Sequence, residues 1–512
     1  MIKFGRFLAI IMIALVALPF SAQEILTLTP LDTYQHGGFD EGAAEIAAYD
    51  TGSQRLFVTN AELATIDILD MSEPTNLTLF AQIDISDLGS GVNSVATFDG
   101  LVAAAIQAEE VDTNGVVAFY DVDGNLLSTV EAGALPDMVT FTPDGSKVLA
   151  ANEGEPNDDY TIDPLGSITI IDISAGVESA TAITVTFEGI EIPDNVRIYG
   201  PNATPAQDLE PEYIAISPDG TTAYISLQEN NALAILDIES ATITAIVGLG
   251  FKDHSLAGNE LDAGKDDGVI NITNWSVLGM YQPDGIATYE VDGNVYIVTA
   301  NEGDTRDYDG YSEEGEIGES AIDEAFPDLA TLSTETAILG LGIVESTGDT
   351  DGDGDLDVLY IPGARSFSIW ASDGTLIWDS GAQFEEITAE ALPDDFNSTN
   401  DENGDFDGRS DNKGPEPEGV TIGVIDGVTY AFIVLERIGG VMIYDITDPT
   451  APTFVTYSNN RDFAGDAEAG TAGDLAPESS VFVSAMDSPT GTNLLIVTNE
   501  VSGTTTVFEI SN

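Results

Sequence analysis

The stretch Val298-Thr299-Ala300-Asn301-Glu302-Gly303 recurs with small changes along the chain. An apolar run with β-forming residues, followed by a glutamate, appears again at 149–154 and at 496–500, and looser copies occur elsewhere. The glutamates of the seven copies are Glu62, Glu109, Glu153, Glu229, Glu302, Glu436 and Glu500. A second apolar run follows each copy, in some cases beyond an insertion. Such repetition indicates an array of similar structural units, and we predict an all-β fold, a seven-bladed β-propeller.

Four short strands can be assigned in most of these units, for example at 45–50, 55–60, 65–69 and 77–85 in the first. Helical periodicity is essentially absent from the sequence. The last unit supplies three strands, whereas the strand at 25–34 has no local partner. We expect this N-terminal strand to complete the last blade, so that the ring closes and leaves no open sheet edge.

The composition narrows the range of partners. The chain of 512 residues is 43% hydrophobic and carries 13 Lys+Arg against 90 Asp+Glu, a formal charge of −77. This charge disfavours nucleic acids and anionic membrane surfaces as partners and favours cations. The alternative is that most of these acids form a solvating coat for a salty environment. We predict a single propeller domain over 23–512, and a monomer.

The first 22 residues resemble a secretory signal peptide. Lys3 and Arg6 precede an apolar segment at 8–20, and the small residues Ser21 and Ala22 follow it. The apolar segment is short for a membrane span, so we expect a mature protein without one, either extracellular or periplasmic. The chain has no cysteine, which excludes disulfide and thiolate chemistry.

The long connections gather on one face of the predicted propeller. Because strands alternate in direction, the b–c and d–a connections emerge together, and these include the insertions at about 251–282, 303–357 and 382–415. Long loops in a compact domain are commonly functional. We therefore expect the functional site on this face.

Two sets of acidic residues fall on the same face. One set consists of the seven glutamates of the repeat, and the other stands at the start of the innermost strands. The second set contains Glu45, Asp137, Glu212, Asp284, Glu418 and Glu478. Crowded carboxylates either bind cations or have raised pKa values, and calcium, a hard cation with oxygen ligands, is our preferred ligand. The alternative is that these acids cap neighbouring backbone amides.

The insertion of the fifth unit contains a separate calcium motif. Its alternating acids with glycine at the sixth position match the first nine positions of an EF-hand loop, whereas the twelfth position is Tyr360. The acids are Asp349, Asp351, Asp353, Asp355 and Asp357. We predict a calcium ion that stabilises this loop. A weaker copy of the spacing lies at 401–407.

Basic residues are scarce, and most lie in or beside the face that carries the long connections, which we call the elaborated face. They are Arg197, Lys252, Lys265, Arg306, Arg365, Arg409, Lys413, Arg437 and Arg461. Arginine beside a calcium cluster is suited to phosphate recognition, and the alternative is that these residues neutralise nearby acids. With His36 and His254 as the sole histidines, a multi-histidine zinc site or a serine–histidine–aspartate triad is poorly supported.

Several longer runs carry a resemblance to a known family. They are residues 39–46, 301–314, 363–370, 395–420 and 473–478. Together they resemble the choice-of-anchor I family of secreted bacterial propellers, which is related to mesenchyme-specific cell-surface glycoproteins of biomineralising animals. The resemblance covers nearly the whole mature chain and implies a secreted propeller associated with calcium. Some bacterial relatives are called alkaline phosphatases, so it also implies a calcium-dependent phosphoesterase.

Two functions follow as hypotheses. The first is a secreted calcium-binding module of the extracellular matrix or of mineral. The second is a calcium-dependent phosphatase acting on phosphate esters, with Glu302, Arg306 and Arg365 as catalytic residues. The ligand set expected on the acidic face comprises Glu153, Glu302, Asp304, Asp307, Asp309, Glu416 and Glu418.

Overall fold

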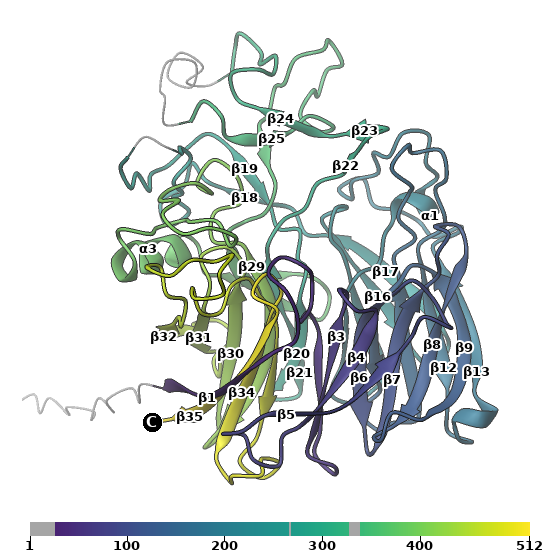
Figure 1. The fold of residues 1–512 in the computed structure, drawn as a ribbon. Coiled ribbons are helices and arrows are strands. Elements are labelled where there is room, and N and C mark those ends of the chain that lie inside the picture. Colours follow the sequence, from purple (N-terminus) through teal and green to yellow (C-terminus); the bar gives the residue numbers. More distant parts are fainter. Residues whose placement is uncertain (1–25, 266–267, 327–337) are drawn as a thin grey trace, which may run out of the picture.

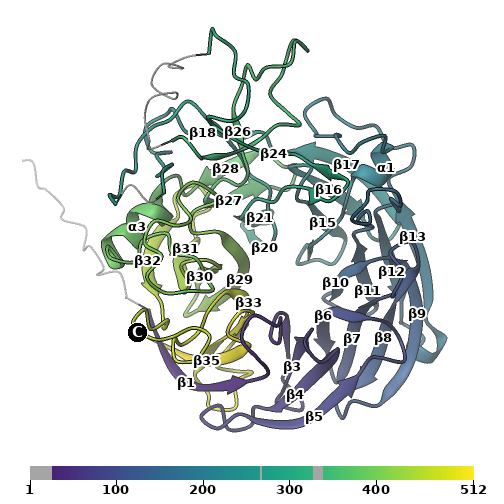
Figure 2. The same ribbon diagram turned by 45° about the horizontal axis from the view of Figure 1, so that its top comes forward.

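In the computed structural model, residues 26–265, 268–326 and 338–512 are described. The predicted signal peptide at 1–22 lies outside the described residues. The regular secondary structure of the described chain is almost all strand, and most of the strands form seven four-stranded antiparallel sheets. Figure 2 shows the sheets arranged around a common centre. The all-β, propeller-like prediction is therefore confirmed.

The first six sheets run in chain order from an inner to an outer strand. The first contains β2 (Ala47–Asp50), β3 (Arg55–Asn60), β4 (Thr65–Asp70) and β5 (Thr78–Asp84). The second contains β6 (Gly91–Phe98), β7 (Leu101–Gln107), β8 (Asn114–Asp121) and β9 (Leu126–Ala134). The third contains β10 (Pro136–Phe141), β11 (Lys147–Asn152), β12 (Ser167–Asp172) and β13 (Thr181–Thr186).

The fourth, fifth and sixth sheets follow the same order. The fourth contains β14 (Ile214–Ile216), β15 (Thr222–Leu227), β16 (Ala232–Asp237) and β17 (Thr242–Gly248). The fifth contains β20 (Ile286–Val291), β21 (Asn294–Asn301), β27 (Ser366–Ala371) and β28 (Leu376–Asp379). The sixth contains β29 (Pro417–Ile425), β30 (Val428–Leu435), β31 (Val441–Asp445) and β32 (Thr453–Ser458).

The seventh sheet combines the two ends of the described chain. Its order is β1 (Thr27–Gln35), β35 (Thr504–Ser511), β34 (Asn493–Asn499) and β33 (Pro477–Val483). The register of β1 on β35 runs from Thr27 opposite Ser511 to Gln35 opposite Thr504. The strand that has no partner near it in the sequence thus pairs with the last strand.

Apolar clusters lie between successive sheets. Phe367 of the fifth sheet and Tyr444 of the sixth, for example, have ring centroids 4.7 Å apart. One cluster joins the first sheet to the seventh through Leu56 and Ile496. Beside it, the Nδ1 atom of His36 lies 2.7 Å from Asp67 of the first sheet, while Nε2 lies 2.9 Å from Thr505 of the seventh.

The insertions add small elements beyond the ends of the sheets (Figure 1). They form a three-stranded sheet of β18 (Phe251–Asp253), β19 (Leu278–Met280) and β26 (Tyr360–Ile361). Two further pairs are β22 (Asp307–Tyr308) with β23 (Tyr311–Ser312), and β24 (Glu314–Glu316) with β25 (Gly342–Val344).

A few helical segments depart from the expectation of a chain without helical periodicity. They are η1 (Val177–Ser179), α1 (Pro205–Asp208) and α3 (Gln383–Ala391). In α3, Phe384, Glu385 and Thr388 are buried at helical spacing, a pattern too short to stand out in the sequence. In the part of the chain that the structure describes, no helix has the length and apolar character needed to cross a bilayer.

The asparagine that precedes the repeat glutamate is a structural residue. The Nδ2 atom of Asn152, fully buried at the end of β11, donates hydrogen bonds to Ser167 O at 3.1 Å and Thr169 Oγ1 at 2.9 Å. Its Oδ1 atom accepts one from Gly133 N at 2.9 Å. Asn301 makes the corresponding bonds to the Oγ atoms of Ser366 and Ser368. This residue therefore joins the ends of neighbouring strands.

The substitution Asn152→Ala tests this role. It leaves a buried backbone amide and hydroxyl groups without their partner, and we expect the free energy of unfolding to fall by about 2 kcal/mol. Chemical denaturation measures the loss. The control is Asn125→Ala in an exposed turn, for which we expect about 0.5 kcal/mol or less. Equal losses in the two variants would contradict the role.

Candidate metal centre

Acidic side chains from six of the seven sheets line one cavity. Each stands at or just before the start of an inner strand, and these strands are β2, β10, β14, β20, β29 and β33. The cavity has a volume of about 410 Å³. It is lined by Glu45, Asp137, Glu212, Asp284, Glu418 and Glu478, with Gln228, Glu302, Asp304, Lys413, Glu436, Arg437 and Glu500. We call this cavity the channel mouth.

The second sheet contributes an amide in place of an acid. Asn93 lines an adjoining chamber of about 210 Å³, and Nδ2 of Asn93 donates to Gln107 Oε1 at 3.1 Å. The chamber shares Glu45, Asp137, Asp284 and Glu478 with the channel mouth. These four acids therefore separate the carboxylate-rich mouth from a chamber lined in part by Ser94, Tyr213 and Ser480.

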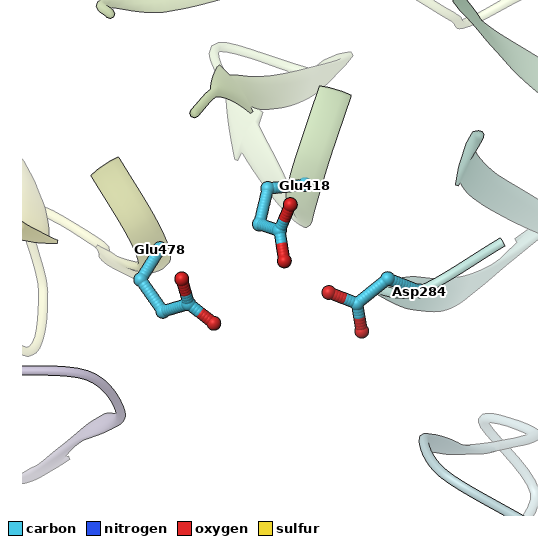
Figure 3. A group of neighbouring side chains, drawn as sticks. All are labelled: Asp284, Glu418 and Glu478. Carbon is cyan, nitrogen blue, oxygen red and sulfur yellow. The ribbon is translucent and has the colours of Figure 1, made fainter. Parts of the chain in front are cut away.

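Two carboxylate triads in the channel mouth have the spacing of a cation site. Asp284, Glu418 and Glu478 each offer an oxygen within 4.8 Å of the others, and their carboxylates converge in Figure 3. Glu302, Glu418 and Glu436 form the second triad by the same measure. Calcium lies about 2.3–2.6 Å from its oxygen ligands. Oxygens within 4.8 Å of one another can therefore bind the same ion.

Burial and mutual repulsion raise the pKa values of these acids. Burial, together with the charges of Glu500 and Asp137, raises the pKa of Glu45 to about 8. Burial and the charge of Asp284 raise the pKa of Asp137 to about 7. The pKa of Glu418 is raised well above its usual range, first by burial and then by Glu302 and Asp284. Without a cation, the channel mouth therefore retains protons near neutral pH.

The few positive charges at the channel mouth surround Glu416. Lys413 contacts Glu302 and lies 3.2 Å from Glu416, while Arg409 and Arg437 approach Glu416 at 2.5 and 3.0 Å. Burial alone would raise the pKa of Glu416, but these three cations lower it to about 2. Because both oxygens of Glu416 are engaged by basic side chains, its placement does not fit the predicted role of metal ligand.

Neither arginine of the predicted catalytic set lines the channel mouth. Arg306 is 1% exposed and pairs with Asp208 at 2.5 Å and Glu210 at 2.8 Å. Arg365, 2% exposed, donates to Glu385 Oε1 at 2.7 Å and to backbone carbonyls. Their placement does not fit a contact with a bound ester. Instead, both guanidinium groups join segments of the long loops to one another.

The remaining predicted ligands of the acidic face divide between two places. Glu302, Asp304 and Glu418 line the channel mouth. Asp309 lines a separate cleft of about 500 Å³, and Asp307 is exposed in β22. Glu153 is buried, and burial followed by the charge of its neighbour Glu155 raises its pKa well above the usual range. It is not among the residues that line the channel mouth.

Lys413, Arg437 and Glu436 complete the channel mouth. The sequence placed Glu436 in the repeat set expected to bind calcium, whereas Lys413 and Arg437 were assigned to no site. The scarcity of basic residues was the available signal for Lys413 and Arg437, because unpaired lysine or arginine is not expected among so many acids. The acids that pair with these basic residues come from different units of the repeat. The spacing of residues along the sequence carries no information on such contacts.

The aspartate-rich loop also presents two triads. Asp349, Asp351 and Asp353 form an exposed one, and Asp355 and Asp357 join Asp323 in the other. The bridge between Ile322 and Leu356 brings Asp323 to the loop, a contact that the sequence did not reveal. Asp349 also accepts hydrogen bonds from the amides of Gly352 at 2.6 Å and Gly354 at 3.0 Å, as amide capping predicts.

The raised pKa values predict how stability changes with pH. Between about pH 4.5 and 8, folded protein holds protons on Glu45 and Asp137 that unfolded protein releases. The free energy of unfolding therefore falls as pH rises through this window. We expect the denaturation midpoint of chelator-treated protein to be lower at about pH 8 than at about pH 5, and Glu45→Gln to reduce the difference. An increase in stability over this interval would contradict the electrostatic account.

Comparison with known proteins gives related sequences. The profile of one family, described as "Choice-of-anchor I domain", matches residues 45–449. Gigasin-3a of Magallana gigas is 32% identical over 187 residues, covering 34% of this chain and 65% of that protein. The mesenchyme-specific cell surface glycoprotein of Strongylocentrotus purpuratus is 30% identical over 283 residues, covering 48% of this chain and 36% of that protein. The chain thus spans less than two thirds of the length of either relative.

A solved structure gives a more distant likeness. Hydrazine synthase of Kuenenia stuttgartiensis aligns over 93% of this chain and 97% of that chain, with a TM-score of 0.47 and 13% sequence identity. This similarity is too low to assign a function.

Proposed function

Because the chain belongs to the choice-of-anchor I family, we propose that it is an extracellular binding module whose channel mouth holds calcium. The name of its sea-urchin relative places that protein at the cell surface. The signal-peptide pattern at 1–22 supports export of this chain as well. An exported protein meets calcium concentrations at which weak extracellular sites are filled, about 10⁻⁴–10⁻³ M.

The proposal includes a closed, seven-bladed propeller as the scaffold. Its support is the set of seven four-stranded sheets, the pairing of β1 with β35, and the apolar cluster between the first and seventh sheets. Closure matters for the site because it would hold acids from six blades at one axis. A rigid ring can keep like charges together that would otherwise separate.

The triad of Asp284, Glu418 and Glu478 carries the calcium proposal. In the described parts of the chain, no lysine or arginine forms an ion pair with any of these three acids. The donors are all oxygen, which suits hard cations, and the 410 Å³ cavity leaves room for the water ligands of a large ion. Calcium tolerates such irregular coordination better than magnesium, which requires near-octahedral geometry.

A binding role fits the geometry better than hydrolysis. The phosphatase hypothesis placed Arg306 and Arg365 beside the ester, and both are buried in ion pairs elsewhere. A calcium ion with open coordination positions can instead bind carboxylate, sulfate or phosphate groups of matrix components or mineral. We therefore propose calcium-mediated adhesion to such extracellular ligands.

Calcium titration of chelator-treated protein tests the site. We expect calcium at about 100-fold over its Kd to stabilise the fold by about 2.7 kcal/mol, seen as a higher melting temperature. Glu418→Gln should weaken binding in the channel mouth at least tenfold by isothermal titration calorimetry. The matched control is Glu109→Gln, an exposed repeat glutamate in the separate cleft. Identical titrations for the two variants would refute the proposal.

We propose a second, structural calcium at the aspartate-rich loop. Asp349, Asp351 and Asp353 are exposed and converge, so an ion there would hold the insertion in one conformation. We expect calcium to slow proteolysis of residues 338–361, and the double substitution of Asp351 and Asp353 to asparagine to abolish this protection. Asp112→Asn, a substitution in another exposed loop, should retain it. Protection that persists in the double variant would exclude an ion at this triad.

A further inference from the structure

We propose that the channel mouth is a two-cation centre in which Glu418 is the bridging ligand. This inference rests on the proposed function and adds to it the number of ions and their order of binding. Glu418 stands at the second position of β29, between the inner strands that present Asp284 and Glu478 (Figure 3). It is the residue common to the two carboxylate triads of the channel mouth.

The condition of Glu418 indicates a missing ligand. The residue is 8% exposed, and its Oε2 atom is buried without a hydrogen-bond partner. A buried carboxylate oxygen without a donor is costly. Without a cation, Glu418 and Asp284 form a side-chain hydrogen bond through a retained proton. Once ionised, the neighbours of Glu418 in both triads donate no hydrogen bond. A cation on one side of Glu418 would join it to Asp284 and Glu478, and a cation on the other side would join it to Glu302 and Glu436.

The two positions differ in the charge that already surrounds them. Asp284 and Glu478 have no ion-pair partner among the described residues, so the first position is uncompensated. In the second, Glu302 contacts Lys413 and accepts a hydrogen bond from Gln228 at 2.8 Å. Glu436 lies 3.2 Å from Arg437 and accepts a hydrogen bond from Asn400 at 2.8 Å. An ion entering the second position must compete with these donors, above all with the ammonium of Lys413. The first position therefore fills at lower calcium concentration than the second.

Lys413 has an alternative partner that permits this competition. Its Nζ atom lies 3.2 Å from Glu416, which also forms ion pairs with Arg409 and Arg437. When a cation takes over Glu302, the ammonium can remain paired with Glu416. Replacing Lys413 by an uncharged residue should therefore strengthen calcium binding at the second position and leave the first position unchanged. Substitutions at Glu478 should instead weaken binding at the first position alone.

Equilibrium dialysis of the full chain against buffered calcium counts the bound ions. Ions at the aspartate-rich loop contribute equally to every variant, so differences from the parent protein are compared. We expect Glu478→Gln and Glu436→Gln each to lose one ion and Glu418→Gln to lose two. We expect Lys413→Met to lower the concentration that half-fills the second position at least fivefold. Glu109→Gln should bind as the parent does.

The outcomes separate this inference from the proposed function. The two-cation centre would be overturned if Glu418→Gln lost one ion and Lys413→Met bound calcium at the same concentrations as the parent protein. The channel mouth would then hold a single calcium ion. No loss in any triad variant would overturn the proposed function as well. Circular dichroism and the melting temperature in chelator verify that each variant is folded before its ions are counted.

Discussion

Repulsion among carboxylates at the channel mouth is the constraint on which the rest of the structure depends. The repeat places an acid at the start of an inner strand in six sheets, and the sheets direct these strands toward one centre. Each acid raises the pKa of its neighbours in addition to the effect of burial, as for Glu45 and Asp137. Packing between the sheets must therefore hold together charges that oppose one another. A bound cation would turn this repulsion into attraction.

The scarcity of positive charge gives the elaborated face its organisation. Arg306 and Arg365 are buried and join long loops to one another through Asp208, Glu210 and Glu385. Such pairs, once buried, are costly to break, so the loops around the channel mouth are fixed in place. Lys413 and Arg437 are the basic residues that line the mouth itself, and they leave most of its acids uncompensated.

Much of the fold could be predicted because it is encoded locally. Short apolar runs define strands such as β3, which the structure has at the expected residues 55–60. The repeat glutamates also mark the correct end of the sheets. The adjacent asparagine, by contrast, received no role, because its partners Ser167 and Thr169 lie across an insertion. Helix α3 was missed for a different reason, because its pattern covers little more than two turns.

The ligand set was predicted less completely than the fold. Pairing among side chains of different sheets decides whether an acid is free to bind, and sequence spacing does not report it. Glu416 and Glu418 are two residues apart, yet one is surrounded by three cations and the other by carboxylates. Asp323 likewise joins the aspartate-rich loop through a strand bridge that no local motif signals.

The most direct test of the central claim is a crystal structure of the mature protein grown with manganese as the probe cation. Anomalous diffraction locates manganese without reference to the protein coordinates. The account predicts anomalous peaks within the channel mouth, coordinated by Asp284, Glu418 and Glu478. Peaks confined to the aspartate-rich loop or to the outer surface, with the carboxylates of the mouth unchanged, would contradict it.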